Sequence, residues 1–333
     1  MEYETNNVLG GDALKAVVYE KFGSPDVLEY KEVEKPTVKE DDILVKIHAS
    51  SMNAIDWHIR IPTPSMARLL GGSAKTLFMK PRFPILGADF AGKIESVGKN
   101  VEQFKVDDEV FGAIKAGCHA EYICVSEKAV ALKPVNMTFE EAAAVPTCGF
   151  MALQGLRDKG NIKSGQRVLI NGASGGVGTF AVQIAKSFGA EVTGVCSIRN
   201  LELVESIGAD EAIDYTREDF TKTSESYDLI FDVVAKSSFS KCKDSLKSEG
   251  VYVSTVFGLR PILRKFWTSM TSSKKMIPYL GKFNKEDIIF VRDLIEAGKV
   301  KSVIDTVYPL REVAEAHRYM EKGHASGKVI ITM

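Results

Sequence analysis

The sequence lacks the features that mark secreted, membrane-spanning or nucleic-acid-binding proteins. Its five cysteines are odd in number and scattered, and no C-x-x-C pair occurs in the 333 residues. This set argues against a disulfide framework and a four-cysteine zinc lobe, and is typical of reduced thiols in the cytosol. The net charge is −1, and no apolar run approaches the roughly 18 residues that a membrane span needs. We therefore expect no nucleic-acid partner, no membrane span and a cytoplasmic location.

Length and composition indicate a globular protein of about two domains. The hydrophobic content of 45% and the charged content of 26% are ordinary for such proteins. Residues 1–13 are acidic and polar, and they lack the basic and apolar regions of a signal peptide. We expect them to form a loose leader before the first domain.

The stretch from 168 to 197 carries the strongest functional signal. Residues 168–170 form a short apolar run, and the glycine-rich segment 172–178 follows it. Apolar residues at three- and four-residue spacing over 180–188 predict a helix, and 192–195 begins a second strand. Strand, turn, helix and strand make a βαβ unit of about 30 residues, the arrangement of a dinucleotide-binding fold.

The composition of the turn suits a pyrophosphate. A helix N-terminus offers free backbone N–H groups and a partial positive charge. Side chains at Gly175 and Gly176 would obstruct the approach of a phosphate, and Gly178 allows close packing of the helix. The usual fingerprint is G-x-G-x-x-G, and Ala173 stands at its first position. The match is partial, and a glycine turn that merely packs is the alternative.

The rest of the chain divides into a β-rich part and an alternating α/β part. Residues 14–125 alternate apolar and polar residues between turns, which predicts a mainly antiparallel, barrel-like domain. Further on, strand-like and helix-like segments alternate, as in a parallel doubly wound sheet. We expect strands over 16–19, 27–30, 43–47, 92–97, 110–112, 121–125, 211–215, 229–233, 250–254, 303–307 and 329–331, and helices over 201–207, 241–246, 288–295 and 313–320.

The region between the two parts is predicted to be helical. Thr138 and Glu141 have the spacing of a capping box, and Pro146 is expected to end that helix before a second helical run at 150–157. Residues 59–83 contain three prolines and two adjacent glycines. They predict a long, partly apolar loop with a short helix, either a binding loop or a packed surface excursion.

The second strand of the βαβ unit indicates which nicotinamide cofactor fits. A site for NADH usually carries Asp or Glu at the end of this strand, and segment 195–199 contains neither. Ser197 and Arg199 can instead bind a 2′-phosphate, through charge-assisted hydrogen bonds of about 1.5–3 kcal/mol each. We therefore expect NADPH, unless Arg199 is only a solvated residue at a helix start.

Several longer segments together resemble a known family. They read GSPDVLEYKEVEKP, MNAIDWHIR, FPILGADFAGKIESVGKNVEQFKVDDEVFG, AAAVPTCGFMALQGL, GASGGVG, GADEAIDY and GHASGKVIITM. From about Leu14 to Met333 the chain resembles the zinc-independent quinone oxidoreductases of the medium-chain dehydrogenase/reductase superfamily. The resemblance implies an α/β fold with a GroES-like catalytic domain over 14–136 and 305–333, and a Rossmann NADPH-binding domain over 137–304. It also implies a homodimer.

The resemblance implies which residues contact the cofactor. Ser174, Gly175, Gly176 and Val177 match the pyrophosphate turn, Ser197 and Tyr215 match adenosine-side positions, Phe257 and Gly258 follow the strand that approaches the nicotinamide, and His324, Ala325 and Ser326 lie in the tail segment that in related reductases reaches the cofactor. From the residues alone, Tyr215 is equally explained as a core aromatic, and His324 as an exposed polar residue.

The resemblance also bears on a catalytic metal. The zinc-dependent relatives use Cys, His and a further Cys or acidic ligand. Here Asn53 stands at the first ligand position, Gly87-Ala88-Asp89 replaces their Gly-His-Glu motif, and only Cys148 matches a ligand. One thiolate does not hold zinc tightly, so we expect no catalytic metal. An unusual site built from Asp56, His58, Asp89 and Cys148 is the alternative.

Chemistry without a metal suits an acceptor that is already electrophilic. We therefore expect hydride transfer from NADPH to a quinone or an α,β-unsaturated carbonyl. Asn53 matches the family's active-site asparagine and can donate to the developing oxygen. His58 is a candidate proton donor, although a loop histidine without a role fits as well. Asp56 would orient His58 or cap a turn, and Thr147 would border the nicotinamide.

Two other functions are compatible with the sequence. The first is an NADPH-binding regulatory or structural protein with little catalysis, because no unambiguous catalytic acid is present. The second is a zinc-type alcohol dehydrogenase, which the missing ligands disfavour.

Overall fold

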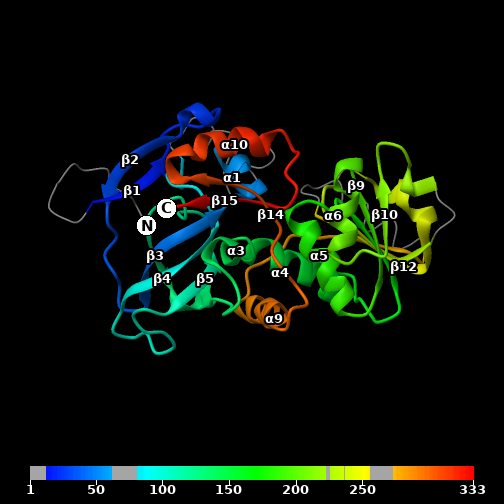
Figure 1. Ribbon diagram of the computed structural model, residues 1–333, viewed down its shortest axis with the longest axis horizontal. Coiled ribbons are helices and arrows are strands. Elements are labelled where there is room, and N and C mark those ends of the chain that lie inside the picture. The colour runs from blue at the N-terminus through cyan, green and yellow to red at the C-terminus, as the bar shows by residue number, and fades with distance from the viewer. Residues whose placement is uncertain (1–12, 62–80, 223–225, 236, 256–272) are drawn as a thin grey trace.

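The computed structural model describes residues 13–61, 81–222, 226–235, 237–255 and 273–333, which form two lobes joined by helices (Figure 1). One lobe holds the N-terminal strands together with the C-terminal strand, and the other holds the strands between 167 and 278. The expected leader, most of the 59–83 loop, and Phe257 and Gly258 lie outside the described residues.

The first lobe is built on a mainly antiparallel seven-stranded sheet. Its order is β14-β15-β3-β4-β5-β7, with β6 paired to β3. The strands are β3 (Asp42–Ser51), β4 (Asp89–Val97), β5 (Glu109–Ala113), β6 (Tyr122–Ser126), β7 (Val130–Leu132), β14 (Ile304–Pro309) and β15 (Lys328–Thr332). A separate antiparallel pair, β1 (Ala13–Val18) and β2 (Glu29–Glu34), lies beside it. The mainly antiparallel, β-rich domain expected for this part is confirmed.

Strand β3 organises this sheet and positions the site. Its first half pairs with β6, its last three residues pair with β15, and β4 runs along most of its length. β3 is a central strand of the sheet, and its apolar residues are buried on both faces. It delivers the chain directly to helix α1 (Ala54–Arg60).

The second lobe is a parallel six-stranded sheet in the order β10-β9-β8-β11-β12-β13. The strands are β8 (Arg167–Asn171), β9 (Glu191–Cys196), β10 (Glu211–Asp214), β11 (Tyr227–Asp232), β12 (Leu246–Ser254) and β13 (Lys275–Pro278). Helices α5 (Gly176–Ser187), α6 (Leu201–Ser206) and α7 (Phe239–Cys242) follow β8, β9 and β11. The chain order reverses beside β8, as in a doubly wound Rossmann sheet, so this prediction is confirmed.

Helices α3 (Phe139–Ala143) and α4 (Pro146–Gln154) connect the lobes. The expected capping box is present, with the Glu141 carboxylate accepting from Thr138 N at 2.9 Å and the Thr138 hydroxyl accepting from Glu141 N at 3.3 Å. One apolar cluster runs from Phe111 of the first sheet, through these helices, to Ile170 of the second. Helix α9 (Lys285–Glu296) packs against α4 from outside, and α10 (Val313–Glu321) covers the first lobe. Within the described ranges, no helix has the length and apolarity to cross a membrane.

Three local expectations are wrong, each for a backbone reason. Residues 25–27 form a 3-10 turn with proline at its first position, so β2 starts only at Glu29. The helix α3 does end before Pro146 as expected, but the second helical run starts at this proline rather than at 150, because the first helical residue needs no amide donor. The expected helix 241–246 ends early, and Leu246 already belongs to β12.

Two fully buried histidines lie in the first lobe. The rings of His119 and His317 are perpendicular, with centroids 6.4 Å apart. His119 Nδ1 contacts the Ser50 hydroxyl at 3.0 Å, and among the described residues the other three ring nitrogens have no hydrogen-bond partner. Burial lowers the pKa of His119 to about 3 and the pKa of His317 well below its ordinary value. Both rings are therefore neutral at physiological pH.

This pair makes the stability of the fold sensitive to acid. An unfolded chain binds these protons near pH 6.5 and the folded chain does not, so stability is full above that pH and falls as the pH drops. Between about pH 6.5 and pH 5, each buried imidazole should cost about 2 kcal/mol of unfolding free energy. Denaturant unfolding at a series of pH values measures this loss.

The variant His317→Gln should have a shallower dependence of unfolding free energy on pH than the wild type. The matched control is His324→Gln, because His324 is exposed. A slope unchanged in His317→Gln would show that the buried ring does not carry the effect.

Candidate active site

The glycine turn after β8 is shaped by close contacts between backbone atoms. Gly172 has a φ of +90°, a conformation that residues other than glycine rarely adopt. A Cβ on Gly178 would lie 2.0 Å from Gly172 O, so the first turn of α5 approaches the strand end as closely as expected. Gly175 caps α5, and a Cβ there would have no atom nearer than 3.5 Å. The amide groups at the start of this 12-residue helix are therefore open to an anion.

Gly176 has a second reason to lack a side chain. A Cβ at this position would lie 3.1 Å from Cys148 Sγ and 3.1 Å from Lys328 Cδ. Cys148 lies in α4, which joins the lobes, and Lys328 lies in β15 of the first lobe. Gly175 also forms an isolated β-bridge with Gly327. The turn thus lies directly against the C-terminal strand, and the missing side chain allows this contact.

Asn200 connects three of the expected cofactor residues. Its side chain is 7% exposed, and its amide nitrogen donates to the Ser174 hydroxyl at 3.0 Å and approaches the Ser197 hydroxyl at 3.5 Å. Its amide oxygen accepts from the Ser326 hydroxyl at 2.9 Å. The glycine turn, the end of β9 and the tail are therefore joined by one amide. We did not predict this role, because an asparagine at a helix start is usually explained as a cap, and Asn200 makes no such bond.

The other expected adenosine-side residues lie around this point. Arg199 is exposed, and its Nη2 donates to the carbonyl oxygen of His324 at 2.6 Å. Tyr215 is 59% exposed, so its interpretation as a core aromatic is wrong. His324 is exposed and Ala325 half-buried, consistent with a tail segment that borders the site.

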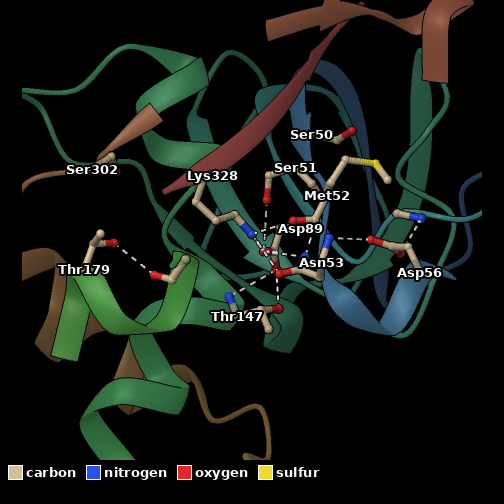
Figure 2. A network of polar contacts seen from close by, with 12 residues as sticks. Ser50, Ser51, Met52, Asn53, Asp56, Asp89, Thr147, Thr179, Ser302 and Lys328 are labelled. Atoms are coloured by element: carbon tan, nitrogen blue, oxygen red, sulfur yellow. Dashed lines mark hydrogen bonds and ion pairs between the residues drawn. The ribbon is translucent and has the colours of Figure 1, made fainter. Parts of the chain in front are cut away.

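A second polar group forms in the first lobe around the fully buried carboxylate of Asp89. Figure 2 shows the surrounding side chains converging on it. Its Oδ1 accepts from the Thr147 hydroxyl at 2.5 Å and from Thr147 N at 3.1 Å. Its Oδ2 accepts from Asn53 Nδ2 at 3.0 Å and from the Ser51 hydroxyl at 3.2 Å. Thus β3, β4 and the start of α4 are joined at one anion.

Lys328 brings a buried cation to the same place. Its side chain is 2% exposed, and its Nζ donates to Asn53 Oδ1 at 2.7 Å and to Met52 O at 2.9 Å. Its Nζ lies 3.6 Å from Asp89 Oδ2. We did not predict this lysine from the sequence. The available signal was a charged residue at the start of an otherwise apolar strand, Lys328–Thr332.

Asp56 and His58, the two residues expected to act together beside Asn53, have different partners in the structure. The Asp56 carboxylate accepts from Asn53 N at 2.7 Å and from Gly87 N at 3.0 Å, so it caps α1 and does not orient His58. Burial raises the pKa of Asp56 to about 7. His58 is half-buried with its ring against Trp57, and burial lowers its pKa. A role of Asp56 in orienting His58 is therefore wrong, whereas His58 as a proton donor stays a prediction.

The structure shows how the Asn53 amide is held. Both of its amide hydrogens have an acceptor, but the contact from Nδ2 to Ser51 O is long, at 3.4 Å. One hydrogen is therefore held by Asp89, and the weakly bound one is the donor that a substrate oxygen would compete for.

The residues at the zinc-ligand positions do not form a zinc site. Asp89 is surrounded by hydrogen-bond donors, and the Lys328 ammonium would repel a second cation. Burial raises the pKa of the Cys148 thiol, which disfavours the thiolate that zinc requires. No cluster of three or more His, Cys, Asp or Glu side chains suited to a metal occurs in the part of the chain that the structure describes.

Comparisons with known proteins agree with both lobes. The alcohol dehydrogenase GroES-like domain family matches residues 39–135, and the zinc-binding dehydrogenase family matches residues 207–331. A 2-methylene-furan-3-one reductase of Solanum lycopersicum is 37% identical over 332 residues, which cover 96% of this chain and 79% of the relative. A chloroplastic NADPH-dependent alkenal/one oxidoreductase of Arabidopsis thaliana is 34% identical, with the same coverage of 96% and 79%.

A solved structure has the same architecture. The quinone oxidoreductase of Coxiella burnetii is 30% identical, with a TM-score of 0.85, and the match covers 97% of this chain and 100% of that one. The expected combination of a GroES-like lobe and a Rossmann lobe is confirmed.

Asn200 yields a test of the cofactor site. In Asn200→Leu the side chain keeps its size but loses its hydrogen bonds, each worth about 1 kcal/mol. The tail and the glycine turn should separate, and the Kd for NADPH should rise about tenfold or more. Fluorescence titration with NADPH measures this change. Asn100→Leu, which changes an asparagine in a surface turn of the first lobe, is the matched control. An unchanged Kd in Asn200→Leu would contradict a role for this amide.

Proposed function

The chain belongs to the quinone oxidoreductase-like proteins of the medium-chain dehydrogenase/reductase superfamily, and from this premise we propose that it is an NADPH-dependent reductase of quinones or α,β-unsaturated carbonyls that works without a catalytic metal. One observation carries the proposal. The Asp89–Asn53–Lys328 network, with no zinc-ligand set, lies directly against the dinucleotide turn at Gly176.

The cofactor side of the site is supplied by the turn and the tail. The glycine turn at the start of α5 suits the pyrophosphate, and Asn200 holds Ser174 and Ser326 beside it. When bound, a reduced nicotinamide cofactor supplies the hydride. Cys148 borders the same space, because its Sγ would lie 3.1 Å from a Cβ on Gly176, and Thr147 precedes it at the start of α4.

The preference for NADPH rests on residues beyond β9. Ser197 and Arg199 follow the strand end, where an NADH site would carry a carboxylate. The Arg199 guanidinium already donates to the His324 carbonyl, so it is held near the tail and can turn to a 2′-phosphate. A relative with 34% identity is named an NADPH-dependent oxidoreductase, which supports the same choice.

The acceptor side favours a substrate that needs little activation. Asn53 has one weakly held amide hydrogen to offer a developing oxyanion, and its surroundings exclude water. No metal is present in this mechanism to polarise a simple aldehyde. Quinones and enones are already electrophilic, and the names of the relatives match these classes. The cytoplasmic location and the homodimer stay predictions.

Removal of the arginine tests the choice of cofactor. Arg199→Ala should lower kcat/KM for NADPH by about tenfold or more, because a charge-assisted hydrogen bond is worth about 1.5–3 kcal/mol. The same variant should leave kcat/KM for NADH nearly unchanged, and NADH thus serves as the internal control. Equal losses with both cofactors would mean that Arg199 acts on the tail through His324 and not on the 2′-phosphate.

An acceptor panel tests the reaction. The purified protein should oxidise NADPH with quinones or 2-alkenals and not with simple aldehydes, and metal analysis should find no stoichiometric zinc. Absorbance at the NADPH band measures turnover. Turnover on aldehydes together with bound zinc would indicate a zinc-type dehydrogenase. Tight NADPH binding without turnover on any acceptor would indicate a binding protein.

A further inference from the structure

The ammonium group of Lys328 is buried where the proposed reaction takes place. Burying a charge costs several kcal/mol unless close partners compensate it. Lys328 is 2% exposed, and its closest partner is Asn53 Oδ1 at 2.7 Å rather than the Asp89 carboxylate at 3.6 Å. The shortest contact of the lysine is therefore with a neutral amide, so the lysine does more than neutralise a carboxylate.

Asp89 is satisfied without the lysine. Each of its oxygens accepts two hydrogen bonds, from Thr147 on one side and from Ser51 and Asn53 on the other. The geometry thus leaves a different task for the ammonium group.

That task concerns the direction of the Asn53 amide. A side-chain amide can exchange its oxygen and nitrogen by a half-turn, and only its partners decide between the two arrangements. An ammonium has donors only, so it requires the amide oxygen, and the Asp89 carboxylate requires the amide nitrogen. The two charged groups, 3.6 Å apart, therefore each bind one end of the amide, and Figure 2 shows the three side chains meeting.

We propose that Lys328 is a positioning residue, which holds the Asn53 amide with its nitrogen toward the acceptor and its oxygen away from it. The proposal rests on the proposed reductase function. Without the ammonium, the amide oxygen would lose its donor and Asp89 alone would hold the amide, so the amide would be less well oriented and the barrier of the reduction would rise. Removal of one preorganised donor costs about a hundredfold or more in kcat, and partial disorder of the amide should cost less.

A double-mutant cycle tests whether Lys328 acts through Asn53. Lys328→Met should lower kcat at least about tenfold, with a smaller change in the KM for the acceptor and in the Kd for NADPH. Asn53→Ala should also lower kcat more than it weakens NADPH binding. In the Asn53→Ala background, the further change Lys328→Met should have little effect, because the amide that it positions is gone. Independent, multiplying losses would overturn the proposal.

Two further variants separate positioning from charge balance. Lys328→Met leaves the Asp89 carboxylate without its cation and can destabilise the fold, whereas Lys328→Met with Asp89→Asn removes both buried charges. This double variant should fold but keep a low kcat, and a return of kcat to the wild-type level would show that the lysine only neutralises Asp89. Lys328→Arg, which still donates, should retain more kcat than Lys328→Met. Lys163→Met, at an exposed lysine of the second lobe, is the matched control.

A spectroscopic measurement keeps the proposal testable without turnover. The two Nδ2–H signals of Asn53, assigned with Asn53→Ala, should shift and exchange faster with solvent in Lys328→Met than in the wild type. Unchanged signals would overturn the proposal. If the wild type reduces no acceptor while these signals still respond, the reductase function fails and the control of the amide by Lys328 stands.

Discussion

The pairing of a buried anion with a buried cation is the constraint on which the rest of the site depends. Asp89 begins β4 and Lys328 begins β15, at positions far apart in the sequence. The Lys328 ammonium would not be stable inside the protein alone, because the loss of its hydration must be compensated by close partners. The C-terminal strand therefore has to return to the first lobe, and its antiparallel pairing with β3 at Ser51 brings the ammonium to Asn53. The need to compensate a buried charge thus constrains the path of the chain.

The same return of the chain brings the two lobes together at the cofactor turn. Gly327 precedes Lys328 and bridges Gly175, and the stem of the lysine would touch a side chain on Gly176. The contact is possible only because the turn lacks side chains. Its glycines therefore serve two purposes, an open backbone toward the pyrophosphate and a close approach of the catalytic lobe. A substitution at Gly176 would disturb both, so its effect on cofactor binding alone would not separate them.

Local patterns predicted the parts of the site that are local in sequence. The glycine turn, the capping box at Thr138 and the alternation of strands and helices depend on neighbouring residues, and the structure confirms them. Asn200 and Lys328 escaped prediction because their partners are distant: Asn200 bonds to Ser326, 126 residues away, and Lys328 bonds to Asn53, 275 residues away. No periodicity or spacing can report such contacts. The misjudged start of α4 at Pro146 has a different origin, since proline suits both the end of one helix and the first turn of the next.

The buried pair also explains why a metal is unnecessary here, in terms of what a metal supplies. A catalytic zinc stabilises a developing oxyanion by direct coordination, and it needs an open position and deprotonated ligands. Lys328 and Asp89 provide no open coordination position. Instead, the two charged side chains together hold a neutral donor, the Asn53 amide, in one orientation. A single amide hydrogen stabilises an oxyanion less than a dication does, so it suffices only where the substrate is already electrophilic. The restriction to quinones and enones that we propose thus follows from the strength of the donor that this network can offer.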